Sequence, residues 1–295
     1  MAEQDDTTDS PDAAEHWGES AKAWASREEP EAGAQAKAAA WMLEAAAIKR
    51  GEHVLELACG AGTVGLQAAE LVGSSGVVVC SDFSEPMVQE VRERIKELDL
   101  KNVEAWILDA TKLRLDGVRF HAVLCRFGYM LLNDPLAALR QGHDALRSEG
   151  RLALAVWGTP EKNLWLSTIL NAVIGHFGAA PPAPGTPGPF ALGDPKRVAA
   201  LLEEAGFVDP EVSLIDGEQR YESLDAWWEE IREISGPLSV VLGSLPEADV
   251  AAIRKQAQAD AAEYVDKAGA VVFPAQVVGA RAVRPRPEPV AAEAD

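Results

Sequence analysis

The stretch from His53 to Gly65 places the tightest constraint on how this chain can fold. A short apolar run, Val54–Leu57, leads at once into a loop of small residues, and an apolar helical pattern follows over Val64–Leu71. Small residues allow a ligand to lie against the backbone, and the first turn of a helix presents free N–H groups. The stretch therefore predicts a strand, a tight loop and a helix that bind a nucleotide-like ligand.

Short apolar strands and helices alternate from Gly51 to residue 157. The predicted strands are Val54–Leu57, Val77–Ser81, Val103–Leu108, Ala122–Cys125 and Gly150–Val156, and the predicted helices are Val64–Leu71, Glu85–Glu97 and Pro135–Leu146. Strands separated by helices form a parallel sheet that is covered on both faces. We therefore expect an α/β fold with a doubly wound, mostly parallel sheet, and a ligand outside the carboxyl ends of its strands.

The alternation breaks down after residue 157. Further patterns predict helices at 163–178, Asp194–Ala205 and 223–268, and strands at Val208–Ile215 and Ala270–Val283. Pro274 predicts that the last strand lies at an edge of the sheet or carries a bulge, because proline has no N–H to donate. Together these patterns predict a seven-stranded sheet with a mostly helical cap.

Composition excludes several classes of protein. A formal net charge of −20 repels nucleic-acid phosphates and anionic lipid. No stretch has the 18 uncharged apolar residues of a membrane span, and the acidic N-terminus lacks the basic and apolar regions of a secretory signal. The three cysteines form no CxxC pair. We expect a cytoplasmic protein with a small-molecule substrate and no metal, and both a monomer and a homodimer remain open.

The glycines of the loop match a dinucleotide fingerprint. Gly60, Gly62 and Gly65 spell GxGxxG, and Asp82 follows Gly62 by twenty residues at the end of the second predicted strand. An NAD-dependent oxidoreductase is therefore one hypothesis. A lone GxGxxG is weak evidence, so other residues must decide.

Three acids at the ends of successive strands indicate a different ligand. A carboxylate at Glu56 would repel a pyrophosphate and would suit a cationic amino group. Asp82 suits ribose hydroxyls, and Asp109 can accept a hydrogen bond from an exocyclic amine. A ligand with an ammonium, a ribose and an adenine but no phosphate is S-adenosylmethionine.

Four motifs resemble those of class I S-adenosylmethionine-dependent methyltransferases: Glu-Leu-Ala-Cys-Gly-Ala-Gly (56–62), Ser-Asp-Phe-Ser-Glu-Pro-Met (81–87), Asp109-Ala110 and Leu-Arg-Ser-Glu-Gly-Arg-Leu (146–152). They are most similar to the branch that contains the ubiquinone/menaquinone-biosynthesis C-methyltransferases and many natural-product methyltransferases. The resemblance covers about residues 40 to 157 and fades beyond. It implies a Rossmann-like methyltransferase fold and transfer of a methyl group from S-adenosylmethionine to an O, C or N atom of a small apolar or aromatic metabolite.

The resemblance also implies a role for each matching residue. The methionine moiety would lie on Glu56, the 58–62 backbone and the Arg126-Phe127 pair. The adenosine would lie on Asp82 and on the residues near the adenine, and an N-terminal helix would close over the cofactor. Where the family often has glycine, this chain has Ala58. The residues so assigned are Trp24, Glu56, Ala58, Gly60, Gly62, Asp82, Phe83, Met87, Asp109, Ala110, Arg126 and Phe127.

The chain divides accordingly into eight segments. They are a disordered acidic tail (1–14), N-terminal lid helices (15–49), the cofactor-binding core (50–157), a cap insertion (158–190), a continuation of the core (191–220), a helical cap (221–268), the last core strand (269–284) and a loose tail (285–295).

Candidates for a general base are few. Their positions in the predicted fold exclude His53, His121 and His143. His176, in the first cap helix, ranks above His16 and Tyr129. The alternative is that no base exists, because methyl transfer from a reactive sulfonium needs mostly proximity and orientation.

Two further alternatives stay open. The four tryptophans Trp157, Trp165, Trp227 and Trp228 either line a pocket for a flat apolar substrate or form the core of the cap. The protein is either a methyltransferase, a protein of that fold with a non-methylating activity, or an NAD-dependent oxidoreductase, because fold does not determine function.

Overall fold

The computed structural model describes residues 17–26, 31, 33–115 and 117–287. The strands are β1 (His53–Leu57), β2 (Val77–Asp82), β3 (Val103–Ile107), β4 (Phe120–Arg126), β5 (Leu146–Trp157), β6 (Val208–Tyr221) and β7 (Val271–Val283). The helices are α2 (Ala21–Ser26), α3 (Ala34–Ala45), α4 (Thr63–Val72), α5 (Glu85–Glu97), α6 (Pro135–Ala145), α7 (Leu164–Phe177), α8 (Pro195–Glu204), α9 (Leu224–Ile234), α10 (Gly236–Gly243) and α11 (Glu247–Asp260). The predicted acidic tail and most of the predicted C-terminal tail lie outside the described residues.

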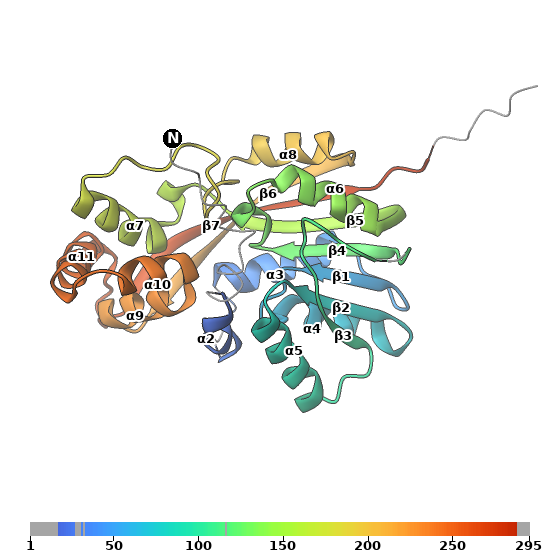
Figure 1. Cartoon of the computed structure of the whole chain (residues 1–295), viewed down its shortest axis with the longest axis horizontal. Helices are drawn as coiled ribbons and strands as arrows, with labels where there is room; N and C mark the ends of the chain where they lie inside the picture. The colour runs from blue at the N-terminus through green and yellow to red at the C-terminus, as the bar shows by residue number, and fades with distance from the viewer. Residues whose placement is uncertain (1–16, 27–30, 32, 116, 288–295) are drawn as a thin grey trace, which may run out of the picture.

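All seven strands form one sheet in the order β3-β2-β1-β4-β5-β7-β6 (Figure 1). β1 to β5 pair in parallel, whereas β7 runs antiparallel to both β5 and β6. The predicted doubly wound, mostly parallel sheet of seven strands is therefore confirmed. Strand order reverses at the adjacent pair β1 and β4, and ligands bind at such a switch point in open α/β sheets.

The helices divide between the two faces of the sheet because crossovers between parallel strands are right-handed. From β1 through α4 to β2, and on through α5 to β3, the chain moves across the sheet in one direction, so α4 and α5 share a face. The crossover from β4 through α6 to β5 moves in the opposite direction, which places α6 on the other face, beside α8. α3 packs against α4 and therefore belongs to the first face.

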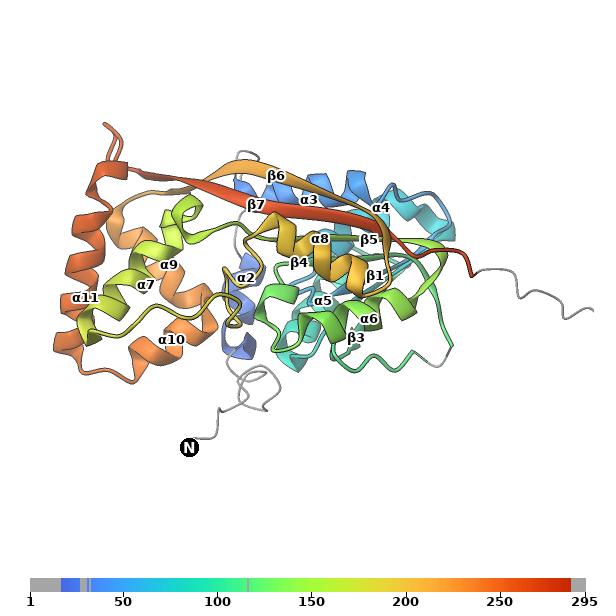
Figure 2. The same cartoon turned by 90° about the horizontal axis from the view of Figure 1, so that it is seen from above.

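The β6–β7 hairpin is longer than the sheet to which it belongs. β6 and β7 pair from Val208↔Val283 to Tyr221↔Val271, whereas β5 pairs with β7 only as far as Trp157↔Val277. Half of the hairpin therefore projects beyond β5. In Figures 1 and 2, α7, α9, α10 and α11 gather around the projecting end, and α2 lies between this helical cap and α5.

The edge position predicted from Pro274 holds at that residue, but most of the last strand is internal. β7 lies between β5 and β6, and β6 forms the edge. Pro274 pairs with Glu218 of β6, in the projecting half of β7 where β5 has already ended. At Pro274 the strand therefore has a sheet neighbour on one side only, which explains how it tolerates a residue without an N–H.

The predicted helical region 223–268 forms three separate helices. α9 begins after Ser223, whose hydroxyl accepts a hydrogen bond from the Ala226 N–H. The chain then meets Pro237 at the start of α10 and Pro246 immediately before α11. Proline is tolerated in the first turn of a helix but not in its interior, so each proline starts a new helix.

The sequence left open whether four tryptophans line a substrate pocket or form the core of the cap. In the structure they form the core of the cap and its contact with the sheet. Trp227 is 0% exposed, and its indole N–H donates to the Trp165 carbonyl at 2.7 Å. Its ring lies 5.1 Å from that of Phe273 in the projecting part of β7. Trp228, Trp165 and Trp157 are also buried, so these side chains hold the cap together and do not line an open pocket.

Within the part of the chain that the structure describes, no helix has both the length and the apolar character needed to span a bilayer.

We expect Trp227→Ala to lower the free energy of unfolding by about 3–5 kcal/mol, because it removes a large side chain from a filled core. Urea denaturation followed by circular dichroism measures the change. Leu98→Ala is the control: Leu98 is 59% exposed, and its removal should change stability by less than about 0.5 kcal/mol. A Trp227→Ala loss no larger than that of the control contradicts this view of the cap.

Candidate active site

The carboxyl ends of β1 to β4 bring four predicted site residues to one edge of the sheet. Glu56 pairs in register with Cys80 of β2 and Leu124 of β4, close to the end of each strand. Asp82 ends β2, and the Leu108 N–H donates to its carbonyl, which places Asp109 beside it. Arg126 ends β4. Residues far apart in the sequence therefore meet at the switch point of the sheet.

The loop between β1 and α4 has an unusual backbone. Ala58, Gly60 and Gly62 adopt φ values of 50°, 54° and 79°, in the left-handed region that favours glycine. Ala58 therefore bears a conformational cost of about 1–2 kcal/mol, which a glycine at this position would avoid. A Cβ placed on Gly60 would meet no described atom within 4 Å. The loop thus presents bare backbone to open space, where a ligand can lie.

Glu56 connects β1 to the first turn of α4. Its Oε2 accepts a hydrogen bond from the Gly65 N–H at 2.8 Å, and the Cys80 thiol also contacts the carboxyl. A carboxylate at the positive end of a helix is favourable. A Cβ on Gly65 would lie 2.5 Å from Glu56 Oε2 and still closer to the Cys80 sulfur. The third glycine of the GxGxxG pattern is therefore required by a protein contact, and not by a pyrophosphate.

Burial changes the acidity of Glu56. The side chain is 2% exposed, and loss of solvation raises its pKa from 4.5 to about 7. The positive charge of Arg126 and the hydrogen bond from Gly65 oppose this rise, whereas the neighbouring Asp82 adds to it. Near neutral pH the site therefore holds a carboxyl that a nearby cation would convert to its charged form.

Arg126 links the site to α3 and to the projecting hairpin. Its guanidinium donates to the Gln35 carbonyl at 3.0 Å and lies 5.7 Å from the centre of the Phe127 ring. The Gln35 side chain in turn accepts a hydrogen bond from Gln219 of β6. Sequence reasoning missed Gln35 and Gln219, because neither belongs to a motif and only the fold brings them together.

Asp82 is held by the backbone on both sides. Its Oδ2 accepts from the Gly60 N–H and its Oδ1 from the Ser84 N–H, each at 3.0 Å. Burial raises its pKa, and these hydrogen bonds oppose the rise. Each carboxylate oxygen has a second lone pair, so Asp82 can still accept hydrogen bonds from a ligand. Of the residues predicted near the adenine, Phe83 is half-buried and Met87 is buried.

Asp109 is fixed in a similar way. Its Oδ1 accepts from the Thr111 N–H at 2.8 Å and from the Thr111 hydroxyl at 2.7 Å. Ala110, beside it, is half-buried. The carboxylate therefore has a defined orientation at the end of β3.

Phe127 has a strained backbone with φ of 60°. Its N–H donates to the Ala155 carbonyl at 2.7 Å, and its ring stacks on Trp157 with centroids 4.2 Å apart. Strain of this kind persists only where the surrounding contacts enforce it, and it is common at functional sites. These contacts hold the half-buried Phe127 at the end of β4, between the core and the cap.

The structure does not bring the functional groups of two of the three candidate bases into the site. His176 lies at the far end of α7, where its Nε2 is 3.1 Å from Asp249 Oδ1 of α11. Tyr129 is buried with no hydrogen-bond partner for its hydroxyl among the described residues, and that hydroxyl lies against Gly142 of α6. Burial raises the Tyr129 pKa well above its usual value. Both placements argue against a general base, and His16 lies outside the described residues.

Trp24 joins α2 to the cap. Its indole N–H donates to the Ile234 carbonyl at the end of α9, at 3.2 Å. On its other side α2 packs against α5. The helix therefore bridges core and cap, and the position of Trp24 beside a bound cofactor stays a prediction.

Comparison with known families agrees with this geometry. Residues 48–169 match the model of a family described as a methyltransferase domain. This segment is similar to a methyltransferase domain. The predicted resemblance is thereby confirmed for the part of the chain that carries its motifs.

Two curated relatives share this part of the domain. The demethylmenaquinone methyltransferase of Listeria welshimeri is 33% identical over 125 residues, which are 42% of this chain and 52% of that protein. The aklanonic acid methyltransferase DauC of a Streptomyces species is 34% identical over 103 residues, 35% and 47% of the two chains. The chain spans about half the length of the curated relatives it matches.

Solved structures share the fold over most of the chain. Phosphoethanolamine N-methyltransferase 2 of Haemonchus contortus, solved with phosphomonomethylethanolamine and S-adenosylhomocysteine, has a TM-score of 0.57 at 17% identity, over 97% of this chain and 61% of that one. The [4+2]-cyclase SpnF has a TM-score of 0.52 at 16% identity, over 84% of this chain and 80% of that one. At these identities the likeness shows the fold alone.

Gly65→Ala should lower the free energy of unfolding by about 1–3 kcal/mol, because its methyl group would overlap Glu56 and Cys80. Gly175→Ala is a matched control in α7, since a Cβ there meets no described atom within 4 Å. Alanine is the better helix former, so the control should be neutral or stabilising by up to about 1 kcal/mol. Thermal and urea unfolding compare the two, and equal effects would contradict the close contact.

Glu56→Gln should stabilise the ligand-free protein at pH 8 but much less at pH 5. The pKa of Glu56 is raised on folding, so the stability that its protonation contributes is present in full below the unfolded pKa and is lost as pH rises through about 7. Glutamine keeps an acceptor for the Gly65 N–H and carries no charge. The gain relative to wild type should grow by about 2 kcal/mol between pH 5 and pH 8 in urea denaturation. Glu70→Gln, at an exposed glutamate of α4, should show no such growth.

Proposed function

We propose that this chain transfers a methyl group from S-adenosylmethionine to a small apolar or aromatic molecule, such as a quinone or a natural product. The observation that carries the proposal is the buried Glu56 carboxyl, held at the start of α4 beside a loop whose Gly60 faces open space. The printed functions of the Listeria and Streptomyces relatives support the same activity and the same two substrate classes. A cytoplasmic location and the choice between monomer and homodimer stay predictions.

The residues present fit the cofactor. Glu56 offers a carboxylate to an ammonium, and the bare backbone of 58–62 leaves room for the methionine chain. Asp82 would accept hydrogen bonds from the ribose hydroxyls through the lone pairs that the backbone leaves available. Asp109 and Ala110 would meet the adenine. Arg126 would keep Glu56 oriented through its charge and through its bond to α3.

S-adenosylmethionine supplies a methyl group on a positively charged sulfur, which departs as the neutral thioether S-adenosylhomocysteine. The cofactor, when bound, would supply this methyl group to an electron pair of the acceptor atom, the carbon–sulfur pair would leave with the thioether, and the acceptor's proton would pass to solvent on product release. The residues of this chain contribute orientation and the exclusion of water, and Phe127 and the cap would cover the reacting atoms. No described side chain is needed as a base.

Two other functions compete with this one. An NAD-dependent oxidoreductase places a pyrophosphate at the start of the first helix, where this chain has the buried carboxyl of Glu56, which would repel it. A non-methylating activity on the same cofactor site is the second candidate. Two observations support it: the fold is shared with the [4+2]-cyclase SpnF, and the side chains of His176 and Tyr129 contact Asp249 and Gly142 away from the cofactor site.

Calorimetry with S-adenosylhomocysteine tests the proposed cofactor. We expect binding that tightens between pH 6 and pH 8, because below about 7 the Glu56 carboxyl must lose a proton to meet the ammonium, at a cost of up to about tenfold per pH unit. Glu56→Gln should bind more weakly and lose most of this pH dependence. Asp82→Asn should also weaken binding, whereas Asp99→Asn, at an exposed aspartate that pairs with Lys101, should not.

Binding of NADH without S-adenosylhomocysteine binding would overturn the proposal in favour of the oxidoreductase. Binding of S-adenosylhomocysteine, with no transfer of label from S-adenosylmethionine to quinone or polyketide acceptors, would favour the non-methylating alternative.

A further inference from the structure

The first turn of α3 lies between the β6–β7 hairpin and the end of β4. On the hairpin side, the Lys37 side chain donates a hydrogen bond to the Asp216 carbonyl at 3.0 Å. On the core side, the Gln35 carbonyl accepts the hydrogen bond from Arg126. The start of one helix therefore contacts both the strand that supports the cap and the arginine beside Glu56.

Gly217 of β6 allows α3 to approach the hairpin this closely. A Cβ placed on Gly217 would lie 2.7 Å from the Cα of Ala34 and 3.0 Å from its nitrogen. Backbone atoms cannot turn aside as the end of a long side chain can, so a larger residue at position 217 must push the first turn of α3 away. The glycine thus helps to determine where the Gln35 carbonyl lies, although it is outside the segment that matches the methyltransferase domain.

A buried pair of amides completes this contact. Gln219 Nε2 donates to Gln35 Oε1 at 2.5 Å, and each of the two residues is 4% exposed. Buried polar groups are nearly always hydrogen-bonded, so each amide holds the other in one orientation. Gln35 therefore takes part in two hydrogen bonds, one through its side chain to β6 and one through its carbonyl to Arg126.

Gln219 also lies next to the core of the cap. It pairs in register with Phe273 of β7, so the two side chains stand on the same face of the hairpin. The Phe273 ring in turn lies 5.1 Å from the ring of Trp227, which is fully buried in the cap. A short path of contacts therefore leads from the cap through Gln219 and Gln35 to Arg126.

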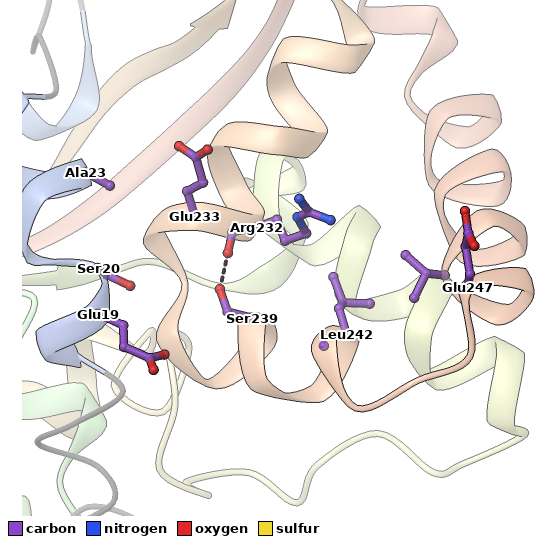
Figure 3. A pocket seen from close by; sticks show the side chains of 10 residues that line it. Glu19, Ser20, Ala23, Arg232, Glu233, Ser239, Leu242 and Glu247 are labelled. Atoms are coloured by element: carbon purple, nitrogen blue, oxygen red, sulfur yellow. Dashed lines mark hydrogen bonds between the residues drawn. The ribbon is translucent and has the colours of Figure 1, made fainter.

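α2 connects the cap and the core less closely. Figure 3 shows a hollow of about 570 Å³ between α2 and the cap helices α9, α10 and α11, with Glu19, Ser20 and Ala23 on the side of α2. The hairpin and α3, by contrast, approach each other backbone to backbone at Gly217. We therefore expect a shift of the hairpin to reach the core through α3.

Arg126 stands beside Glu56. Glu56 pairs in register with Leu124, and Arg126 follows Leu124 by two residues, which places its side chain on the same face of the sheet. Its positive charge favours the ionised carboxyl and opposes the rise in pKa that burial causes. The position of the guanidinium therefore affects how readily Glu56 becomes the carboxylate that an ammonium needs.

The other titratable groups around Glu56 do not replace this charge. Asp82 of β2 is an acid and raises the Glu56 pKa, and α4 contributes the Gly65 N–H. Three thiols of β2, β4 and the loop after β1 also lie near, and burial raises the pKa of each, so they stay uncharged near pH 7: Cys59, Cys80 and Cys125. Arg126 is thus the side chain whose positive charge opposes the effect of burial.

We propose that Gln219 and Gln35 are positioning residues of the cofactor site, which act with Gly217 to hold α3 where its carbonyl fixes the Arg126 guanidinium beside Glu56. The hairpin that supports the cap thereby helps to determine how much of Glu56 carries its charge. The consequence for cofactor binding rests on the proposed methyltransferase function, whereas the effect on Glu56 in the ligand-free protein does not.

Titration of Glu56 in the ligand-free full chain tests the positioning role. Nuclear magnetic resonance on protein with isotope-labelled glutamate follows its carboxyl carbon, whose signal is identified by its loss in Glu56→Gln. Wild type should titrate near pH 7. Gly217→Ala and Gln219→Leu should each raise the midpoint by about 0.5–1 pH unit, because Arg126 is held less firmly. Gly243→Ala in α10, where a Cβ meets no described atom within 4 Å, should leave it unchanged.

A double-mutant cycle shows whether Gln219 acts through Arg126. Arg126→Gln should raise the midpoint by itself, and adding Gln219→Leu to it should cause little further change. Leucine is similar to glutamine in volume, so Gln219→Leu carries the test if Gly217→Ala does not fold. An unchanged midpoint in folded Gln219→Leu, or a full Gln219→Leu shift in the Arg126→Gln background, would overturn the proposal.

Calorimetry with S-adenosylhomocysteine extends the test to the cofactor. A higher midpoint leaves less Glu56 charged at pH 7, so Gln219→Leu should bind about two- to fivefold more weakly than wild type at pH 7 but nearly equally at pH 8.5. The same loss at both pH values would contradict a role through the charge of Glu56. If wild type does not bind S-adenosylhomocysteine, the methyltransferase function fails, while the titration still decides the positioning role.

Discussion

The contact between the Glu56 carboxyl and the Gly65 N–H organises the centre of this protein. It draws the first turn of α4 onto the end of β1 so closely that only glycine fits at position 65. Burial of the carboxyl at this place raises its pKa to about 7, although the hydrogen bond from Gly65 opposes the rise. The arrangement is unfavourable for the charged form of the free protein and becomes favourable when a cation arrives. Binding and stability therefore oppose each other at one residue.

The second organising feature is the long β6–β7 hairpin. The C-terminal half of β7 joins the hairpin to the rest of the sheet, and the helical cap lies around the projecting end of the hairpin (Figure 2). Two hydrogen bonds between distant segments help to hold the core and the cap together. One joins Gln219 to Gln35, and the other joins Trp24 to the Ile234 carbonyl.

Sequence patterns predicted the core well because local physics decides it. Short apolar strands, helices between them and the small residues of the loop each carry their own signal, and the alternation then implies the parallel sheet. The same patterns did not predict how the cap is divided into helices or where its supporting strand lies in the sheet. The break of 223–268 into three helices depends on Pro237 and Pro246, and the internal position of β7 depends on how far β5 extends. His176 was placed by helical pattern alone, which does not say which helix it will face.

By itself the sequence determined the alternation of strands and helices in the core, the tight loop of small residues at 58–62 and the three acids at the strand ends, because these depend on residue type and spacing within short segments. Tertiary structure alone decided what those acids contact and which tryptophans become core. The reason is physical: burial, hydrogen-bond partners and pKa all depend on neighbours supplied by distant parts of the chain. Glu56 is an acid in the sequence, but only its burial in the folded protein raises its pKa to about 7, against the opposing effects of Arg126, Gly65 and Cys80.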